Sequence, residues 1–163
     1  MITMKCSKCG EGTLRALLVP RVAEVGGVRY EGAIPARECP SCGESTVHSD
    51  DVFAFERGVA HHMATHGPAS GETFRFMRRA IDLNAKTLAE IFDTNPETVS
   101  RWENGRVGLD PHTWMTLSSM VIDLMEGRTL TRDRLQALQA KRWAKGGRSR
   151  PRPPPATKKA HTA

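Results

Sequence analysis

Short β-prone runs occupy the first part of the chain and predict a small sheet. They span residues 14–19, 22–25, 28–30 and 33–34, and they are separated by Gly26-Gly27 and by Gly32. A Gly-Gly pair between two such runs is a hairpin signal. We therefore expect a hairpin that turns at Gly26-Gly27 and a strand break at Gly32.

A helical stretch follows the predicted sheet. Asp50 and Asp51 suit a helix N-terminus, because acidic side chains complement its partial positive charge. The stretch runs to about Thr65, and its apolar residues recur at spacings of three and four: Val52, Phe55, Val59 and Met63. Glycine, proline and serine in residues 67–71 mark a linker between two domains, which we place at residues 1–66 and 72–142.

The helical period continues from Glu72 onward and predicts five short helices. Local capping residues agree with this division. Asn84 precedes the second helix, Asn95 precedes the third with proline next, Gly105 ends the third, and Asp110 starts the fourth. The apolar positions of the five helices are Phe74, Met77, Ile81; Leu88, Ile91, Phe92; Val99, Trp102; Trp114, Leu117, Val121, Leu124; and Leu130, Leu135, Leu138. The expected fold class is therefore α+β, with a small sheet and a helix followed by a five-helix domain.

The positive charge of the chain is concentrated at its C-terminal end. The formal net charge is +6, but residues 141–163 hold eight basic residues and no acid, so residues 1–140 sum to −2. Residues 143–163 are also rich in proline and cannot pack a core, so we expect a disordered basic tail. Such a tail either adds non-specific affinity for nucleic acid or only keeps the chain soluble.

The sequence contains no segment typical of membrane insertion. An uncharged apolar run of about 20 residues is absent, and the N-terminus lacks an apolar signal core. We therefore expect a soluble, cytoplasmic protein.

Four cysteines form the strongest single signal in the sequence. They occur as two Cys-x-x-Cys pairs separated by 29 residues, Cys6/Cys9 and Cys39/Cys42, and each pair is followed by glycine. Four thiolates at this spacing predict one structural Zn²⁺ per chain, held at about 2.3 Å from each sulfur. Two disulfides or free structural cysteines are the alternatives.

Two histidines are rival metal ligands. His62 and His66 are four residues apart on the predicted helix, a spacing that can bind a metal. No acid lies within a helical turn of either histidine, so we interpret them as surface residues of an amphipathic helix.

Residues 83–105 have the features of a helix-turn-helix. Ala89 is the small residue that the close packing of two helices requires, and Asp93 stands where the turn needs a left-handed residue. Val99 and Trp102 are expected to face the core. The outward residues of the second helix are Glu97, Thr98, Ser100, Arg101 and Asn104, and such residues enter the major groove of DNA in this motif.

The motif resembles the Cro-type (XRE) helix-turn-helix over residues 72–126, with residues 98–105, TVSRWENG, as its hallmark. The resemblance implies five helices, a homodimer and a palindromic operator in double-stranded DNA. By motif position, Pro96, Glu97 and Arg101 stand where the family reads bases, and Thr98 and Arg106 stand at phosphate-facing sites. Two positions depart from the family pattern: Ala85 replaces a polar residue, with Lys86 beside it as a substitute, and Pro96 has no side-chain hydrogen-bonding group. The candidate DNA-binding residues are Lys86, Pro96, Glu97, Thr98, Ser100, Arg101, Asn104 and Arg106.

The whole arrangement is similar to the MqsA-type antitoxins, which join a YgiT-type zinc finger to an XRE domain. Residues 4–142 follow that order, and the basic tail departs from it. The resemblance implies a repressor that regulates its own operon, dimerises through the C-terminal domain and binds a toxin, an mRNA interferase, through the zinc domain.

Other functions stay open at this point. One is a stand-alone zinc-containing regulator with no toxin partner. Another is a protein that sequesters a toxin and whose helical domain only dimerises, although an outward Arg101 has no role in such a helix. We expect no enzyme activity, because the sequence shows no nucleophile with an adjacent base, no His-x-Glu deaminase pattern and no glycine-rich phosphate loop.

Overall fold

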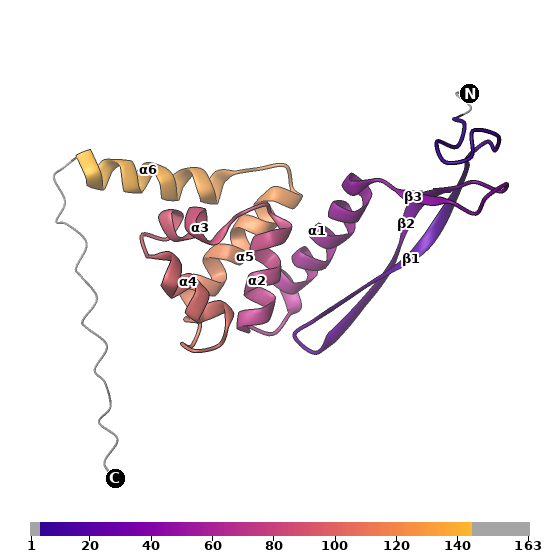
Figure 1. Ribbon diagram of the computed structural model, residues 1–163. Coiled ribbons are helices and arrows are strands. Elements are labelled where there is room, and N and C mark those ends of the chain that lie inside the picture. The colour runs from indigo at the N-terminus through magenta and orange to yellow at the C-terminus, as the bar shows by residue number, and fades with distance from the viewer. Residues whose placement is uncertain (1–3, 145–163) are drawn as a thin grey trace, which may run out of the picture.

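The computed structural model describes residues 4–144 and shows an α+β fold (Figure 1). In these residues a three-stranded antiparallel sheet, ordered β1-β2-β3, is followed by six helices. Residues 143 and 144, the first two of the predicted basic tail, end the last helix instead, and the rest of the tail, from residue 145 onward, lies outside the described residues. None of the helices in residues 4–144 combines the length and the apolarity needed to cross a membrane.

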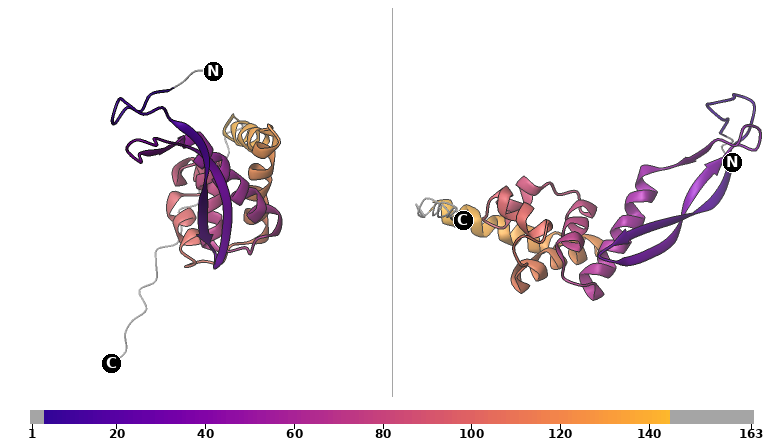
Figure 2. Two further views of the ribbon diagram at one scale, coloured as in Figure 1. Left: turned by 90° about the vertical axis from the view of Figure 1, so that its right-hand side faces the viewer. Right: turned by 60° about the horizontal axis from the view of Figure 1, so that its bottom comes forward.

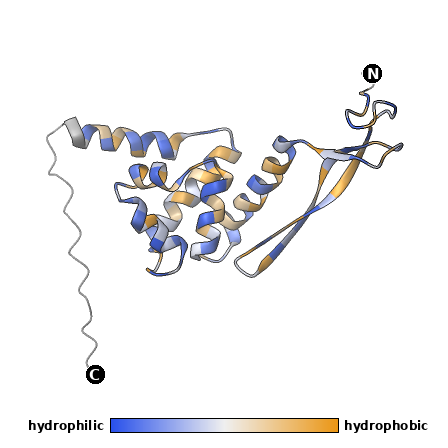
Figure 3. Cartoon of the chain, viewed as in Figure 1, coloured by the Kyte–Doolittle hydropathy of each residue, from blue (hydrophilic) through white to orange (hydrophobic). Residues whose placement is uncertain are grey.

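A long hairpin forms most of the sheet. Its strands are β1 (Arg15–Val25) and β2 (Val28–Glu38), and the short strand β3 (Ser45–Val47) pairs with the end of β2. Gly26 and Gly27 have φ values of 61° and 74°, which is the geometry of a type I′ turn. The predicted hairpin is thus confirmed at Gly26-Gly27. Both strands contain hydrophobic stretches interrupted by hydrophilic residues (Figure 3).

The strand break expected at Gly32 is wrong. Gly32 lies inside β2 and pairs with Arg21 of β1. A Cβ on Gly32 would stand only 2.8 Å from the ring of Phe55, so the missing side chain makes room for a helix residue rather than ending the strand.

Helix α1 (Ser49–His66) connects the sheet to the remaining helices. Its Phe55 contacts Gly32 of β2, and its Val59, Ala60 and Met63 are buried. These buried side chains belong to the same apolar cluster as Phe74 and the other core residues that follow. The predicted linker therefore separates α1 from the next helix along the chain, but the buried side chains before and after it form one apolar core.

The remaining helices begin and end where the sequence predicts, within a few residues. They are α2 (Gly71–Ala80), α3 (Ala85–Ile91), α4 (Pro96–Glu103), α5 (Pro111–Met125) and α6 (Leu130–Ala144). The side chains of Asn84, Asn95 and Asp110 each accept a backbone N–H in the first turn of the helix that follows. Gly105 has φ 64° just after α4, as a helix terminus requires.

Helix α6 lies across α3 and α5. Leu135 packs against the core, and the side-chain amide of Gln139 donates to the carbonyl of Ile91, 2.8 Å away, at the end of α3. The apolar positions of α5 and α6 separate into two groups. Leu117 and Val121 are fully buried, whereas Leu124, Leu130 and Leu138 are 37%, 52% and 58% exposed.

Candidate metal centre and candidate nucleic-acid interface

The four cysteines meet at the end of the hairpin that lies away from its turn. Cys6 and Cys9 come from the loop before β1, and Cys39 and Cys42 come from the loop between β2 and β3. Their four sulfur atoms all lie within 4.8 Å of one another. Figure 2 shows these loops at the tip of a hairpin that extends away from the helices.

The sulfur spacing fits one tetrahedral metal ion. A metal with four thiolates at about 2.3 Å places neighbouring sulfurs about 3.8 Å apart. The Sγ atoms of Cys6 and Cys42 are 3.7 Å apart and those of Cys9 and Cys39 are 3.6 Å apart. All four thiols are free, and these distances are far from the roughly 2.05 Å of a disulfide bond.

The backbone around the sulfurs is shaped to hold them. Gly10 and Gly43, which follow the second cysteine of each pair, have φ values of 72° and 69° and donate their N–H to the carbonyls of Cys6 and Cys39. A Cβ on Gly12 would lie 2.3 Å from the sulfur of Cys39, so only glycine leaves room for the cluster. The loops are therefore closed around the four thiols by local backbone geometry.

The electrostatics of the cluster also favour a cation. Backbone N–H groups of Gly12 and Glu11 hydrogen-bond the sulfur of Cys9 and lower the pKa of this thiol to about 6. The Glu44 backbone also favours the thiolate of Cys42, but burial and the hydrogen bonds of the other three thiols outweigh it and raise the pKa of Cys42 to about 12. Four thiolates this close repel one another, and a divalent ion removes that repulsion.

His62 and His66 do not form a second cluster of this kind. Their rings stack with centroids 4.8 Å apart, the ring of Tyr30 approaches His62 edge-on at 5.7 Å, and the Nδ1 atom of His66 is 2.6 Å from the hydroxyl of Thr65. Among residues 4–144, the four cysteines are the one group of three or more potential ligands whose donor atoms converge.

A second candidate site is the helix α4, which lies at the opposite end of the molecule from the cysteines (Figure 1). A tight turn joins α3 to α4, and Asp93 in that turn has φ 52°, the left-handed conformation expected for it. Ala89 of α3 and Val99 of α4 are buried between the helices, and Trp102 is half-buried against Phe74 and Phe92. One side of α4 is thus fixed in the core and the other side faces solvent.

Ion pairs hold α4 against α2. They were not predicted from the sequence. The carboxylate of Glu103 accepts two hydrogen bonds from Arg78, at 2.6 and 3.2 Å, and a third from Arg75 at 3.3 Å. Arg78 also donates to the carbonyl of Leu83 at 2.5 Å. Both members of the main pair are buried, with 6% of Arg78 and 9% of Glu103 exposed. The two residues are 25 positions apart, so no local sequence pattern indicates the pair, and only the packing of α2 against α4 reveals it.

The structure brings most of the predicted DNA-binding residues to the solvent side of α4 and its flanks. Pro96, Glu97 and Arg101 are exposed, and so are Lys86 at the start of α3 and Arg106 after α4. The N–H of Arg106 donates to the carbonyl of Arg101, which places the two arginines at the same end of α4.

Three predicted residues are already engaged within the protein. The hydroxyl of Thr98 donates to the side chain of Asn95 at 2.8 Å. The amide of Asn104 donates to Ser100, and its carbonyl oxygen accepts from Arg75 at 2.7 Å. Asn104 and Ser100 therefore belong to the contacts that fix the end of α4.

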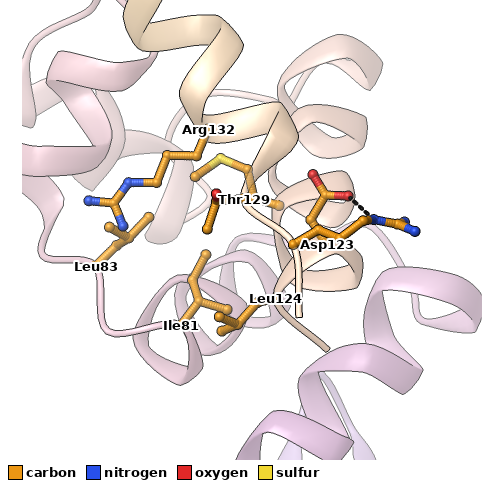
Figure 4. A pocket seen from close by; sticks show the side chains of 8 residues that line it. Ile81, Leu83, Asp123, Leu124, Thr129 and Arg132 are labelled. Atoms are coloured by element: carbon orange, nitrogen blue, oxygen red, sulfur yellow. Dashed lines mark ion pairs between the residues drawn. The ribbon is translucent and has the colours of Figure 1, made fainter. Parts of the chain in front are cut away.

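A small cavity lies behind these helices, between the α2–α3 turn, α5 and α6 (Figure 4). It measures about 40 Å³ and its floor is apolar, including Ile81, Leu83 and Leu124. Asp123 and Arg128 form an ion pair at its mouth with a separation of 3.5 Å. A cavity of this volume holds a few water molecules and is far below the volume of an ordinary ligand pocket.

Comparison with known proteins adds no identification. No protein-family model matches the chain, and no curated protein matches it.

Proposed function

We propose that this protein is a zinc-containing, sequence-specific DNA-binding repressor that acts as a homodimer in the cytoplasm. The observation that carries the proposal is the solvent side of α4, where Arg101 is exposed on a helix whose opposite side is fixed in the core. In this proposal α3 and α4 form a helix-turn-helix, and α4 enters the major groove of an operator with two-fold symmetry.

The ion pairs and hydrogen bonds between α2 and α4 support the proposal that α4 contacts the base edges of DNA. A helix that reads base edges must hold its side chains in register, since each specific contact depends on a fixed geometry. Glu103 and Asn104, at the end of α4, are bonded to Arg75 and Arg78 of α2. Arg101 stands two residues before Glu103, the first residue of this anchored end of α4.

The low net charge of the helical part means that, in this proposal, sequence-specific binding of DNA depends on a few residues. Residues 72–140 contain nine basic and ten acidic residues, so they sum to −1. A broad basic surface is therefore absent from this segment. Arg101 is the residue best placed to donate two hydrogen bonds to a guanine edge, a contact that contributes about 1–3 kcal/mol of discrimination.

The proposed homodimer uses apolar residues of α5 and α6 that the core leaves uncovered. Leu124, Leu130 and Leu138 keep much of their surface exposed, although their helices are otherwise packed. Covering these side chains with a second copy removes apolar surface from water, which favours association.

We further propose that the repressor is an MqsA-type antitoxin. The order of the two cysteine pairs, the segment of residues 98–105 and the zinc-site spacing support this proposal. Zn²⁺ is the metal that four thiolates in a closed tetrahedral site favour. In this proposal the cysteine-bearing end binds an mRNA interferase toxin, and the protein represses its own operon.

A selection experiment tests the DNA-binding proposal. The full-length protein is used to select sites from a random duplex library, and gel shifts then compare the selected duplex with a scrambled one. Arg101→Ala should lower the ratio of the two affinities by about 5- to 150-fold, which corresponds to 1–3 kcal/mol. Arg57→Ala, which removes an exposed arginine from α1, is the matched control and should keep the wild-type ratio. If Arg101→Ala keeps that ratio, or if no sequence is enriched, α4 does not read DNA.

A further inference from the structure

The three-stranded sheet is incomplete along one edge of β2. Strand β2 has 11 residues and pairs with β1 over its whole length. On its other side β3 has three residues and pairs only with Ala36, Arg37 and Glu38. Beside residues 28–35 the structure therefore has no third strand in the part of the chain that it describes.

The hairpin geometry shows which backbone groups face this open edge. In a two-residue hairpin the residues that flank the turn, Val25 and Val28, exchange both hydrogen bonds, so the even-numbered residues of β2 bond to β1. The odd-numbered residues then point the other way. The N–H of Cys39 donates to Glu44 on the β3 side, which confirms this alternation. Arg29, Glu31 and Ala33 thus direct their N–H and C=O groups to the open edge.

The opposite edge of the sheet is interrupted by a proline. On β1 the even-numbered residues point outward, and Pro20 lies at one of them in the middle of the strand. Proline supplies no N–H, and it is one of the means by which proteins prevent strand pairing at a free edge. On β2 the only proline is Pro35, at the end of the open segment nearest β3. The longer uninterrupted row of outward-facing N–H groups is therefore on β2 and not on β1.

A groove accompanies the open edge. It measures about 570 Å³ and lies between residues 29–35 of β2 and one side of α1. Ala54 and Gly58 line the helix side, and a Cβ on Gly58 would meet no atom within 4 Å. Phe55 lies beside Gly32 and His62 beside Tyr30, so α1 runs antiparallel to β2 along the groove. Small side chains on the helix leave the space that a third strand needs.

We propose that this groove binds an extended segment of a partner protein, which adds to β2 as an antiparallel strand in line with β3. About seven residues match the open length of β2. The segment bonds to the main chain of Arg29, Glu31 and Ala33 and turns apolar side chains, at every second position, toward Ala54 and Gly58. Asp51 lines the groove on the first turn of α1, near the Pro35 end, so a lysine or arginine at the N-terminal end of the segment complements it.

The proposal concerns an edge of the sheet that plays no part in the DNA-binding proposal. It commits to a partner protein because residues 145–163 of this chain contain no Val, Leu, Ile, Met, Phe, Tyr or Trp to direct into the groove, and their four prolines lack the N–H groups that a ladder requires. The experiment below distinguishes a partner protein from a second copy of this chain paired through β2.

The test uses the full-length, zinc-loaded protein and a displayed library of random heptapeptides. Enriched peptides are synthesised with a fluorophore, and their affinities are measured by fluorescence anisotropy. Ala33→Pro removes one N–H from the open edge, and Ala16→Pro makes the same change on the outer edge of β1 and serves as the matched control. Gly58→Arg fills the groove from the helix side without changing the sheet.

The expected result is a set of peptides with alternating apolar residues and a basic residue near the N-terminus. Ala33→Pro and Gly58→Arg should each weaken binding by about tenfold or more, whereas Ala16→Pro should bind as the wild type does. Bound peptide should slow hydrogen exchange at the amides of Arg29, Glu31 and Ala33. The proposal is overturned if no such peptides are enriched, or if Ala33→Pro and Gly58→Arg bind them as the wild type does. It is also overturned if Ala33→Pro converts a dimer to a monomer, because the groove then binds a second copy of this chain. Gel shifts with the selected DNA should be unchanged in all three variants, so failure here is separate from failure of the DNA-binding proposal.

Discussion

The buried pair of Arg78 and Glu103 supports a quantitative prediction about stability. Glu103→Ala removes an acceptor of three hydrogen bonds and leaves the guanidinium of Arg78 buried with no carboxylate beside it. Removing one member of a buried ion pair costs about 3–5 kcal/mol, because the remaining charge has lost its water and gains nothing in return. At roughly 2–4 °C per kcal/mol for a chain of this size, the melting temperature should fall by about 6–20 °C.

The cause of this loss is separable from the loss of packing. Arg78→Met should also destabilise the protein, because it leaves the carboxylate of Glu103 buried with only Arg75 to neutralise it. The double variant Arg78→Met/Glu103→Ala leaves no uncompensated charge. Its loss should therefore be smaller than the sum of the two single losses by about 1–3 kcal/mol.

The assay is urea denaturation followed by circular dichroism. Glu90→Ala is the control, since Glu90 is an exposed acid on the neighbouring helix α3 and its change should stay within about 0.5 kcal/mol. A loss below about 1 kcal/mol for Glu103→Ala would mean that the pair behaves as an exposed ion pair does. Strict additivity in the double variant would equally refute the reasoning.

Three further predictions concern other parts of the fold. Cys39→Ser should abolish stoichiometric zinc, measured by atomic emission, while the helical circular dichroism of the protein is retained. Gly26→Ala and Gly27→Ala should each lower the free energy of unfolding by about 1 kcal/mol, because alanine is strained in the left-handed conformation. A urea titration should show the larger loss for Gly26→Ala, because its Cβ would stand 2.8 Å from a methyl carbon of Thr73. Hydrogen bonds from the Thr131 backbone and side chain lower the pKa of Asp123, so its contribution to stability is complete above the unfolded-state pKa of about 4 and is lost as the pH falls through the lower folded-state pKa. Asp123→Asn should therefore flatten the fall in melting temperature below about pH 4.

The features that local chemistry determines were predictable from the sequence. The turn at Gly26-Gly27 and the caps at Asn84 and Asn95 each depend on residues a few positions apart. The two cysteine pairs lie 30 and more positions apart, but each Cys-x-x-Cys pair is itself a local metal-binding pattern, and two such pairs predict one shared site. In each case one residue type satisfies a specific geometric need, so the pattern carries the structural information directly.

Features that depend on contacts between distant segments were not predictable in this way. Glu103 bonds to Arg78, 25 residues earlier, and no local pattern links the two. Gly32 looked like a strand break because its role, leaving room for Phe55, depends on where α1 packs. The groove beside β2 was missed for the same reason, since it requires the relative lengths of β2 and β3 as well as the small residues of α1.

The long hairpin has a consequence for how the protein is degraded. Val25, at the turn end of the hairpin, belongs to the apolar core, whereas the cysteine loops stand at its far end, away from the helices (Figure 2). At about 3.3 Å per residue, a strand of this length separates the two ends by roughly 35 Å. In the proposed zinc-bound form, loss of the metal should therefore free the cysteine loops locally, without opening the helical core. A protease would then gain an unfolded segment to engage while α2 to α5 remain folded. The lifetime of the zinc-bound form in a cell should therefore depend on the supply of metal more than on the global stability of the fold.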